Sequence, residues 1–154
     1  MVRERTTRLL QDVARFLDCM ASHGRHHIAC GILFSNNTTT LGINIVSSLG
    51  PASVCAEQVA LGEALKSPGP SAEIVVTLRA TFLPGRRHEI VPPCGRCREL
   101  LWQYTPHAQV VIPQSHGEGV EGYSFDLVRV ADLLPFPFVR RDRGVLSRQN
   151  VQPL

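Results

Sequence analysis

The sequence contains no apolar run long enough to cross a bilayer. Its longest apolar runs, such as residues 74–76 and 110–112, are very short, whereas a membrane helix needs about 20 apolar residues. The N-terminal segment Met1–Arg5 is charged and leads into a mixed segment, not into the apolar core of a signal peptide. These absences predict a cytoplasmic protein that makes no contact with membranes.

The sequence also lacks internal repeats, low-complexity segments and any long basic run with interleaved aromatic residues. Its formal net charge is +3, and Lys66 is its only lysine, so almost all of its positive charge comes from arginine. Much of the excess lies near the C-terminus, at Arg140, Arg141, Arg143 and Arg148. A basic tail can contact nucleic acid, but without a basic and aromatic strand-binding track we interpret it as a solvated arm or an inter-subunit strap.

The length of the chain, 154 residues, fits a single domain with its own core. We assign residues 1–139 to this domain and residues 140–154 to a basic C-terminal tail. Within the domain, the periodicity of apolar residues predicts a helix at 8–20, strands at 27–34 and 41–46, a helix at 52–65, a strand at 73–82, a helix at 94–104, and strands at 110–112 and 123–128. This order indicates an α/β fold in which helices cover both faces of a mixed sheet, with a strand–helix–strand crossover between parallel strands.

The five cysteines are Cys19, Cys30, Cys55, Cys94 and Cys97. An odd number of cysteines without a secretion signal argues against a disulfide framework. Cys19 lies in a helical pattern and Cys30 in an apolar strand-like run, so we interpret both as core residues. The other three cysteines are candidate metal ligands.

These three cysteines lie in two short motifs, Cys55–Glu57 (Cys-Ala-Glu) and Pro93–Cys97 (Pro-Cys-Gly-Arg-Cys). A Cys-x-x-Cys pair alone is weak evidence, because it also occurs in redox sites and structural zinc sites. Three cysteines at predicted helix starts, one of them two residues before a glutamate, form a narrower pattern. That pattern is typical of zinc deaminases, which carry a His or Cys near a Glu, followed by Pro-Cys-x-x-Cys.

The spacing of the motifs suits the binding of one Zn²⁺ by Cys55, Cys94 and Cys97. Cys94 and Cys97 are three residues apart and face nearly the same way in the first helical turn, where the helix dipole favours thiolates. Three protein ligands leave the fourth tetrahedral position open, as in catalytic zinc sites. Because three thiolates give the zinc centre a net negative charge, we expect Arg96 or Arg98 to hydrogen-bond the sulfurs.

Glu57 is interpreted as an acid–base residue, not as a ligand. It would take a proton from a water that zinc activates towards hydroxide, deliver it to a ring nitrogen, and pass a second proton to the departing amine. The alternative is an ordinary first-turn glutamate that is favoured by the helix dipole. Its position two residues after Cys55 favours the catalytic interpretation.

These residues resemble the cytidine deaminase superfamily, in particular its small nucleoside-type branch of cytidine and blasticidin S deaminases. Residues 42–45 (Gly-Ile-Asn-Ile) are similar to the Gly-x-Asn-Val segment of cytidine deaminases, and residues 131–135 to their Glu-Leu-Leu-Pro turn. Residues 93–101 and 59–62 are similar to blasticidin S deaminases. The resemblance covers residues 26–138.

The resemblance implies a three-layer α/β/α fold with a mixed five-stranded sheet, one zinc per subunit, and a homotetramer (or dimer) with active sites at subunit contacts. It also implies hydrolysis of the exocyclic amine of a small-molecule aminopyrimidine. By position, Asn44 would bind a ribose hydroxyl. The backbone of Ala56 and the carbonyl of Pro93 would hold the ring carbonyl and the amine.

Three residues depart from the family pattern. Val46 stands where cytidine deaminases carry a glutamate that contacts ribose, and His26, a candidate substrate contact, aligns with a phenylalanine that stacks on the base. Gln58 stands where members with three cysteine ligands usually carry an arginine that supports the thiolates. We therefore expect the chemistry to be kept, on a cytidine-like nucleoside or on a blasticidin S-type or other heterocycle. A non-catalytic, zinc-structured binding domain is the alternative from another class.

Overall fold

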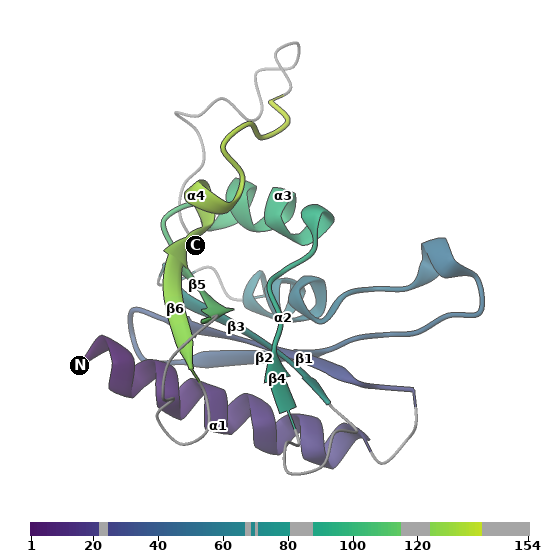
Figure 1. Cartoon of the computed structure of the whole chain (residues 1–154). Helices are drawn as coiled ribbons and strands as arrows, with labels where there is room; N and C mark the ends of the chain where they lie inside the picture. Colours follow the sequence, from purple (N-terminus) through teal and green to yellow (C-terminus); the bar gives the residue numbers. More distant parts are fainter. Residues whose placement is uncertain (22–24, 67–68, 70, 81–87, 115–123, 140–154) are drawn as a thin grey trace.

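The computed structural model describes residues 1–21, 25–66, 69, 71–80, 88–114 and 124–139 (Figure 1). The tail assigned to residues 140–154 lies outside these ranges. The described elements are α1 (Val2–Ala21), β1 (Ile28–Phe34), β2 (Thr39–Ile43), the 3₁₀ turn η1 (Gly50–Ala52), α2 (Ala56–Ala64), β3 (Ala72–Ala80), β4 (His88–Ile90), α3 (Gly95–Tyr104), β5 (Gln109–Pro113), β6 (Phe125–Arg129) and α4 (Val130–Leu133). In this part of the chain, no helix is both long and apolar enough to cross a membrane.

A mixed sheet forms the middle layer, with the strand order β2-β1-β3-β5-β6 and with β4 also paired to β3. β1 pairs antiparallel with both β2 and β3. β3 and β5 run parallel, as predicted for the strand–helix–strand connection through α3. β6 then pairs antiparallel with β5.

The predicted number of five strands is wrong, because β4 makes the sheet six-stranded. β4 pairs with the C-terminal end of β3, at Leu78–Ala80, while β5 pairs with Ile74 and Val75 nearer its N-terminal end. Both short strands therefore use the side of β3 that faces away from β1. A strand of three residues is too short to show an alternation of polar and apolar residues, so sequence periodicity did not reveal it.

The α/β/α arrangement of three layers is confirmed, with α1 beneath the sheet and α2 and α3 above it in the view of Figure 1. Alternate residues of β3 serve the two cores: Ile74, Val76 and Leu78 pack with the leucines of α1, and Val75 packs with the α2 side. Cys30 is buried, as predicted, in the core between the sheet and the helices α2 and α3. The interpretation of Cys19 as a core residue is wrong, because its side chain is exposed.

Gly42 of β2 determines how closely α2 packs against the sheet. A Cβ at this position would lie 2.4 Å from the backbone oxygen of Ala56 and 2.4 Å from the backbone nitrogen of Ala60. Backbone atoms cannot turn aside as a flexible side chain can, so only glycine permits this approach. A hydrogen bond from the Thr40 hydroxyl to the Ala60 carbonyl, at 3.1 Å, holds the same two elements together. The position of β2 therefore fixes the first turns of α2.

We expect Gly42→Ala to push α2 away from the sheet and to destabilise the protein by about 1–3 kcal/mol, the usual cost of overpacking. Gly62→Ala is the matched control, because a Cβ there meets nothing within 4 Å on the exposed side of α2. That change should stabilise the helix by about 0.5–1 kcal/mol. Thermal unfolding of the two variants measures both effects, and equal melting temperatures would contradict the close approach at Gly42.

Candidate metal centre

The N-termini of α2 and α3 meet above the sheet, and each begins at a cysteine. Cys55 is the N-cap residue of α2, Cys94 is the N-cap residue of α3, and Cys97 lies in the first turn of α3. Their three sulfur atoms lie within 4.8 Å of one another. The sulfur atoms of Cys55 and Cys94 are 3.8 Å apart. The fold thus brings together the three cysteines that the sequence motifs selected.

The spacing and chemistry of the three sulfurs fit a zinc ion. With Zn–S bonds of about 2.3 Å and tetrahedral angles, ligand sulfurs lie about 3.8 Å apart, which is the separation of Cys55 and Cys94. Soft thiolate donors favour Zn²⁺ over Mg²⁺ or Ca²⁺. Within the described ranges, no fourth Cys, His, Asp or Glu joins the group. The donor set is therefore that of a site with one position open to a small molecule.

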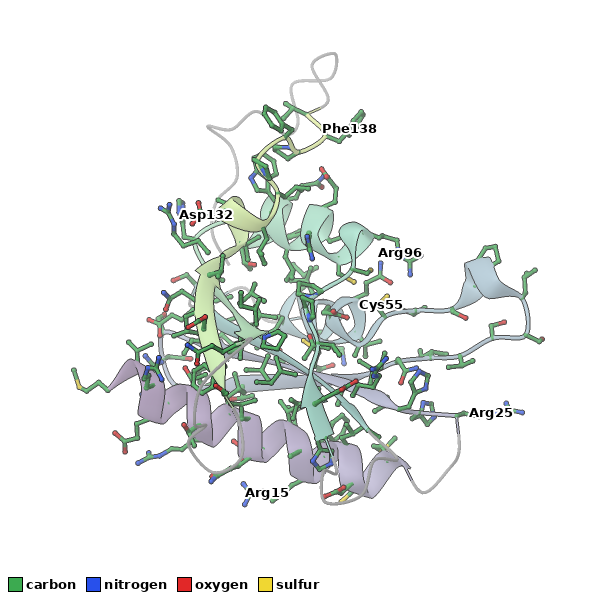
Figure 2. The ribbon with its side chains drawn as sticks, in the orientation of Figure 1. Arg15, Arg25, Cys55, Arg96, Asp132 and Phe138 are labelled. Carbon is green, nitrogen blue, oxygen red and sulfur yellow. The ribbon has the colours of Figure 1, made fainter. Side chains whose placement is uncertain are left out.

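Arg96 supplies positive charge beside this group. Its Nη2 lies 3.8 Å from the sulfur of Cys55, and it donates to Oε1 of Gln58 at 3.1 Å and to the carbonyl of Ser53 at 3.2 Å. Figure 2 shows the side chain reaching from α3 towards Cys55. The hydrogen bond to Cys55 raises the pKa of Arg96, so the guanidinium stays charged.

Gln58 connects Arg96 to the start of α2. Its Oε1 accepts a hydrogen bond from the backbone N–H of Cys55 at 3.3 Å, in addition to the one from Arg96. The N-terminal N–H groups of a helix lack partners within the helix, so this contact satisfies one of them. Gln58 thereby helps to fix the backbone of Cys55, while Arg96 of α3 provides the charge next to the sulfur.

The environment of the thiols differs from one cysteine to the next. Burial raises the pKa of Cys97, and the negative charge of Glu57 raises it further. Burial also acts to raise the pKa of Cys94, but hydrogen bonds from the backbone and thiol of Cys97 and from Cys55 outweigh it, so the pKa of Cys94 is lowered. Binding all three as thiolates therefore requires a strong positive charge among them, as a divalent cation provides.

Glu57, in the first turn of α2, places a carboxyl group beside the sulfurs without joining their group. Its side chain is buried, with only 5% of its surface exposed. Burial raises the pKa of Glu57; its own backbone N–H, the thiol of Cys97 and the hydroxyl of Thr77 act in the opposite direction and partly offset that effect. Such a carboxyl holds a proton more readily than an exposed one does, which suits a group that accepts and returns protons.

A cavity of about 440 Å³ gives access to these groups. Cys55, Glu57 and Cys94 line it on the helix side, and Thr77 and Arg79 line it from β3. Ligand cavities usually measure about 300–1,000 Å³, so the space suits a small heterocycle with a substituent. The two β3 residues were missed by the sequence analysis, because alternation along a strand indicates the face of a residue but not the site it borders.

Asn44 and Ala56, two of the predicted substrate contacts, line the cavity. Oδ1 of Asn44 accepts hydrogen bonds from the backbone N–H groups of His27 and Ile28, each at 2.9 Å. These bonds tie the end of β2 to the start of β1. Because Oδ1 is used in these two bonds, the Nδ2 group is the part of the Asn44 side chain that can donate hydrogen bonds. It lies 3.4 Å from Nδ1 of His27.

His26 and Pro93, the other two predicted contacts, are not among the described residues that line the cavity. Nδ1 of His26 lies 2.7 Å from the backbone oxygen of Asn44. The carbonyl of Pro93 accepts a hydrogen bond from Nε of Arg98 at 2.8 Å. Arg98 thus contacts the segment that precedes α3. The sequence predicted that Arg96 or Arg98 hydrogen-bonds a sulfur, and in the structure Arg96 makes that contact.

A family model described as "Cytidine and deoxycytidylate deaminase zinc-binding region" matches residues 3–113. The matched range contains the three cysteines and Glu57. Blasticidin-S deaminase from Bacillus cereus is 23% identical over 141 residues, which cover 90% of this chain and 96% of that protein.

Two solved structures show a similar fold. Cytidine deaminase from Bacillus anthracis has a TM-score of 0.67 at 17% identity, over 84% of this chain and 86% of that chain. Cytidine deaminase from Mycobacterium leprae has a TM-score of 0.59 at 16% identity, over 82% of this chain and 98% of that chain. At these identities the likeness establishes the arrangement of helices and strands.

We expect Cys94→Ala to abolish stoichiometric zinc binding and to lower the melting temperature of the protein purified with zinc, because metal binding contributes to folding stability. Cys19→Ala is the control, because Cys19 is an exposed cysteine of α1, across the sheet from the cluster. Elemental analysis of the two variants gives the metal content. A full complement of zinc in Cys94→Ala would contradict this ligand set.

Arg96→Gln should weaken zinc binding by about 10–100-fold, the usual effect of removing a group that supports the ligands. Competition with a chromophoric chelator measures the change. Arg15→Gln serves as the control, since Arg15 pairs with Asp12 on the exposed side of α1. An unchanged affinity in Arg96→Gln would show that the contact with Cys55 does not support the thiolate.

Proposed function

The chain belongs to the cytidine and deoxycytidylate deaminase family, and on that premise we propose that it is a zinc-dependent hydrolase that removes the exocyclic amine of a cytidine-like aminopyrimidine nucleoside or a related heterocycle. The position of Glu57 carries this proposal. Its carboxyl is buried beside three sulfurs, borders a cavity and is not part of the sulfur group. A structural zinc site is closed by four ligands and has no need of such a carboxyl.

Cys55, Cys94 and Cys97 would hold the zinc ion. When bound, zinc supplies Lewis-acid activation of water at neutral pH. Arg96 offsets the charge of the thiolates through its contact with Cys55. The N-termini of α2 and α3 add partial positive charge at the same place.

Glu57 would hold and move the protons of the reaction. Its carboxylate would take one proton from the attacking water and give it to the ring nitrogen. It would then take the remaining proton from the hydroxyl that has been added to the ring carbon and pass it to the leaving amine, as that oxygen becomes a carbonyl and the carbon–nitrogen bond breaks. Both transfers are easiest when the pKa of the carboxyl lies near the working pH. The burial that raises the pKa of Glu57 acts in that direction.

Two groups in the cavity wall are suited to orient the substrate. Ala56 is the first residue of α2, and the N–H of a first helical residue has no partner within the helix, so it can bind a ring carbonyl. The Nδ2 group of Asn44 can donate to a ribose hydroxyl. His26 and Pro93 stay predictions as substrate contacts.

A blasticidin S-type compound is the second candidate substrate. Val46 lines the cavity at the position where the resemblance places a ribose-binding glutamate, and an apolar side chain cannot accept a hydrogen bond from a hydroxyl. This feature favours a substrate whose substituent differs from unmodified ribose. The similarity to blasticidin-S deaminase, which extends over most of both chains, points the same way.

We also propose that the protein acts as a homotetramer or dimer. Ile45, Val46 and Leu49 are exposed apolar residues on the segment between β2 and α2, which projects from the body of the fold in Figure 1. A second copy of the chain would cover them.

A site of three thiols suits the cytoplasm, where cysteines stay reduced. The proposed partner is a small molecule, and neither nucleic acid nor membrane forms part of the proposal.

We expect the purified protein to bind about one zinc per chain and to release ammonia from at least one compound in a screen of cytidines, aminotriazines and blasticidin S. Glu57→Gln should keep its zinc and lower kcat by about 10²–10⁴-fold, because the amide cannot shuttle protons.

The control for this test is Glu63→Gln, a partly exposed glutamate of the same helix that pairs with Lys66. It should keep its activity. Full activity of Glu57→Gln on an identified substrate would disprove the role of Glu57. A zinc-loaded wild-type protein that released no ammonia from any of these compounds would instead favour a non-catalytic domain.

A further inference from the structure

Thr77 is a polar residue in the cavity wall that the proposed chemistry does not yet use. It lies in β3, opposite Cys30 of β1, and borders the same cavity as Glu57. Its side chain is buried, with 2% of its surface exposed. Its hydroxyl has no hydrogen bond of normal length and angle to any described residue. Burying an unsatisfied hydroxyl costs about 1–3 kcal/mol, so packing alone does not explain a threonine between Val76 and Leu78.

The hydroxyl of Thr77 is directed towards protein groups and not towards the open cavity. Its oxygen is inaccessible to solvent, so a substrate in the cavity cannot reach it directly. Thr77 lines the same cavity as Glu57 and lies opposite Cys30 in the β1–β3 ladder, and its hydroxyl acts to lower the pKa of both groups.

Of these two groups, Glu57 is the better acceptor. The thiol of Cys30 already contacts the carbonyl of Gly31, at 3.8 Å, and sulfur is a weak acceptor. A carboxylate has two oxygens and accepts several hydrogen bonds. The hydroxyl of threonine also keeps its proton at any pH at which the protein is folded, which a thiol does not. Thr77 is therefore a permanent donor next to Glu57.

The backbone of Thr77 is held on both sides. It pairs with Cys30 in the β1–β3 ladder, and its carbonyl accepts a hydrogen bond from the N–H of Val91 at 3.0 Å. A β-branched side chain has few rotamers, so a fixed backbone fixes the direction of the hydroxyl. The contact with Val91 also ties β3 to the segment that leads to Cys94. The backbone contacts therefore hold the Thr77 hydroxyl at a fixed position relative to Glu57 and to the segment that carries Cys94.

We propose that Thr77 is a positioning residue for Glu57. Its hydroxyl donates a hydrogen bond to one carboxylate oxygen when zinc is bound, and it thereby turns the other oxygen towards the sulfur group and the ring of the substrate. This inference rests on the proposed function, because the benefit of a fixed carboxylate lies in its proton transfers.

Thr77→Val removes the donor and keeps the shape of the side chain. We expect kcat to fall by about 10–100-fold, since a small misplacement of a reacting group can cost about 10²-fold, while KM changes by less than about threefold because Thr77 does not touch the substrate. Zinc content should stay the same. The melting temperature of the metal-free variant should stay level or rise, because without metal the buried hydroxyl has no hydrogen-bond partner to lose among the described residues.

Two further variants separate positioning from a structural role. Thr77→Ser keeps the hydroxyl but loses a buried methyl group, so its melting temperature should fall while its kcat stays within about threefold of the wild type. Thr105→Val removes another buried threonine hydroxyl, which donates to the carbonyl of Leu101 at 3.1 Å away from the cavity. It should lower the melting temperature and leave kcat unchanged.

Wild-type kcat in Thr77→Val would overturn the inference, and so would rates that follow the melting temperatures across the three variants. A crystal structure of the zinc-loaded wild type provides a test that needs no activity. The Thr77 oxygen should lie about 2.6–3.0 Å from a carboxylate oxygen of Glu57, and a separation beyond hydrogen-bonding distance would disprove the contact. A protein that kept this contact and bound zinc, but deaminated no compound, would contradict the proposed function and not the placement of Thr77.

Discussion

The close packing of α2 on the sheet determines the geometry of the whole site. Gly42 lets the backbone of α2 approach β2, and this approach sets the height above the sheet at which Cys55 and Glu57 lie. α3 must then begin at the same height for Cys94 and Cys97 to reach the sulfur of Cys55. Neither helix alone forms a metal site, so the site depends on tertiary structure and not on either motif by itself.

The chemistry of the site depends on several negatively charged groups that lie close together. Three thiolates and a carboxylate within a few ångströms repel one another strongly, and burial of Glu57 and Cys97 increases the cost. Arg96 and two helix N-termini offset part of it. The remainder calls for a strong positive charge among the sulfurs, such as a divalent cation provides.

The sequence predicted the layers and the clustering of the three cysteines because both leave strong local signals. Apolar periodicity indicated the helices and the longer strands, and the Cys-Ala-Glu and Pro-Cys-x-x-Cys motifs identified the sulfurs. β4 left no signal because three residues define no period. Cys19 was assigned to the core by its helical context, yet it lies two positions after the buried Leu17, about 200° further around the helix. The choice between Arg96 and Arg98, and the place of Thr77, depend on contacts between segments far apart in the chain.

Gln58 shows how a departure from a family pattern can preserve a physical requirement. The resemblance places an arginine there to support the thiolates, and its absence suggested a gap in the charge balance. Arg96 fills that gap from α3 and hydrogen-bonds Gln58 as it does so. A glutamine accepts this hydrogen bond through Oε1, whereas an arginine at position 58 would only donate and would repel Arg96. Gln58 and Arg96 therefore form a matched pair, in which α3 supplies the cation beside Cys55 and α2 supplies its hydrogen-bond acceptor.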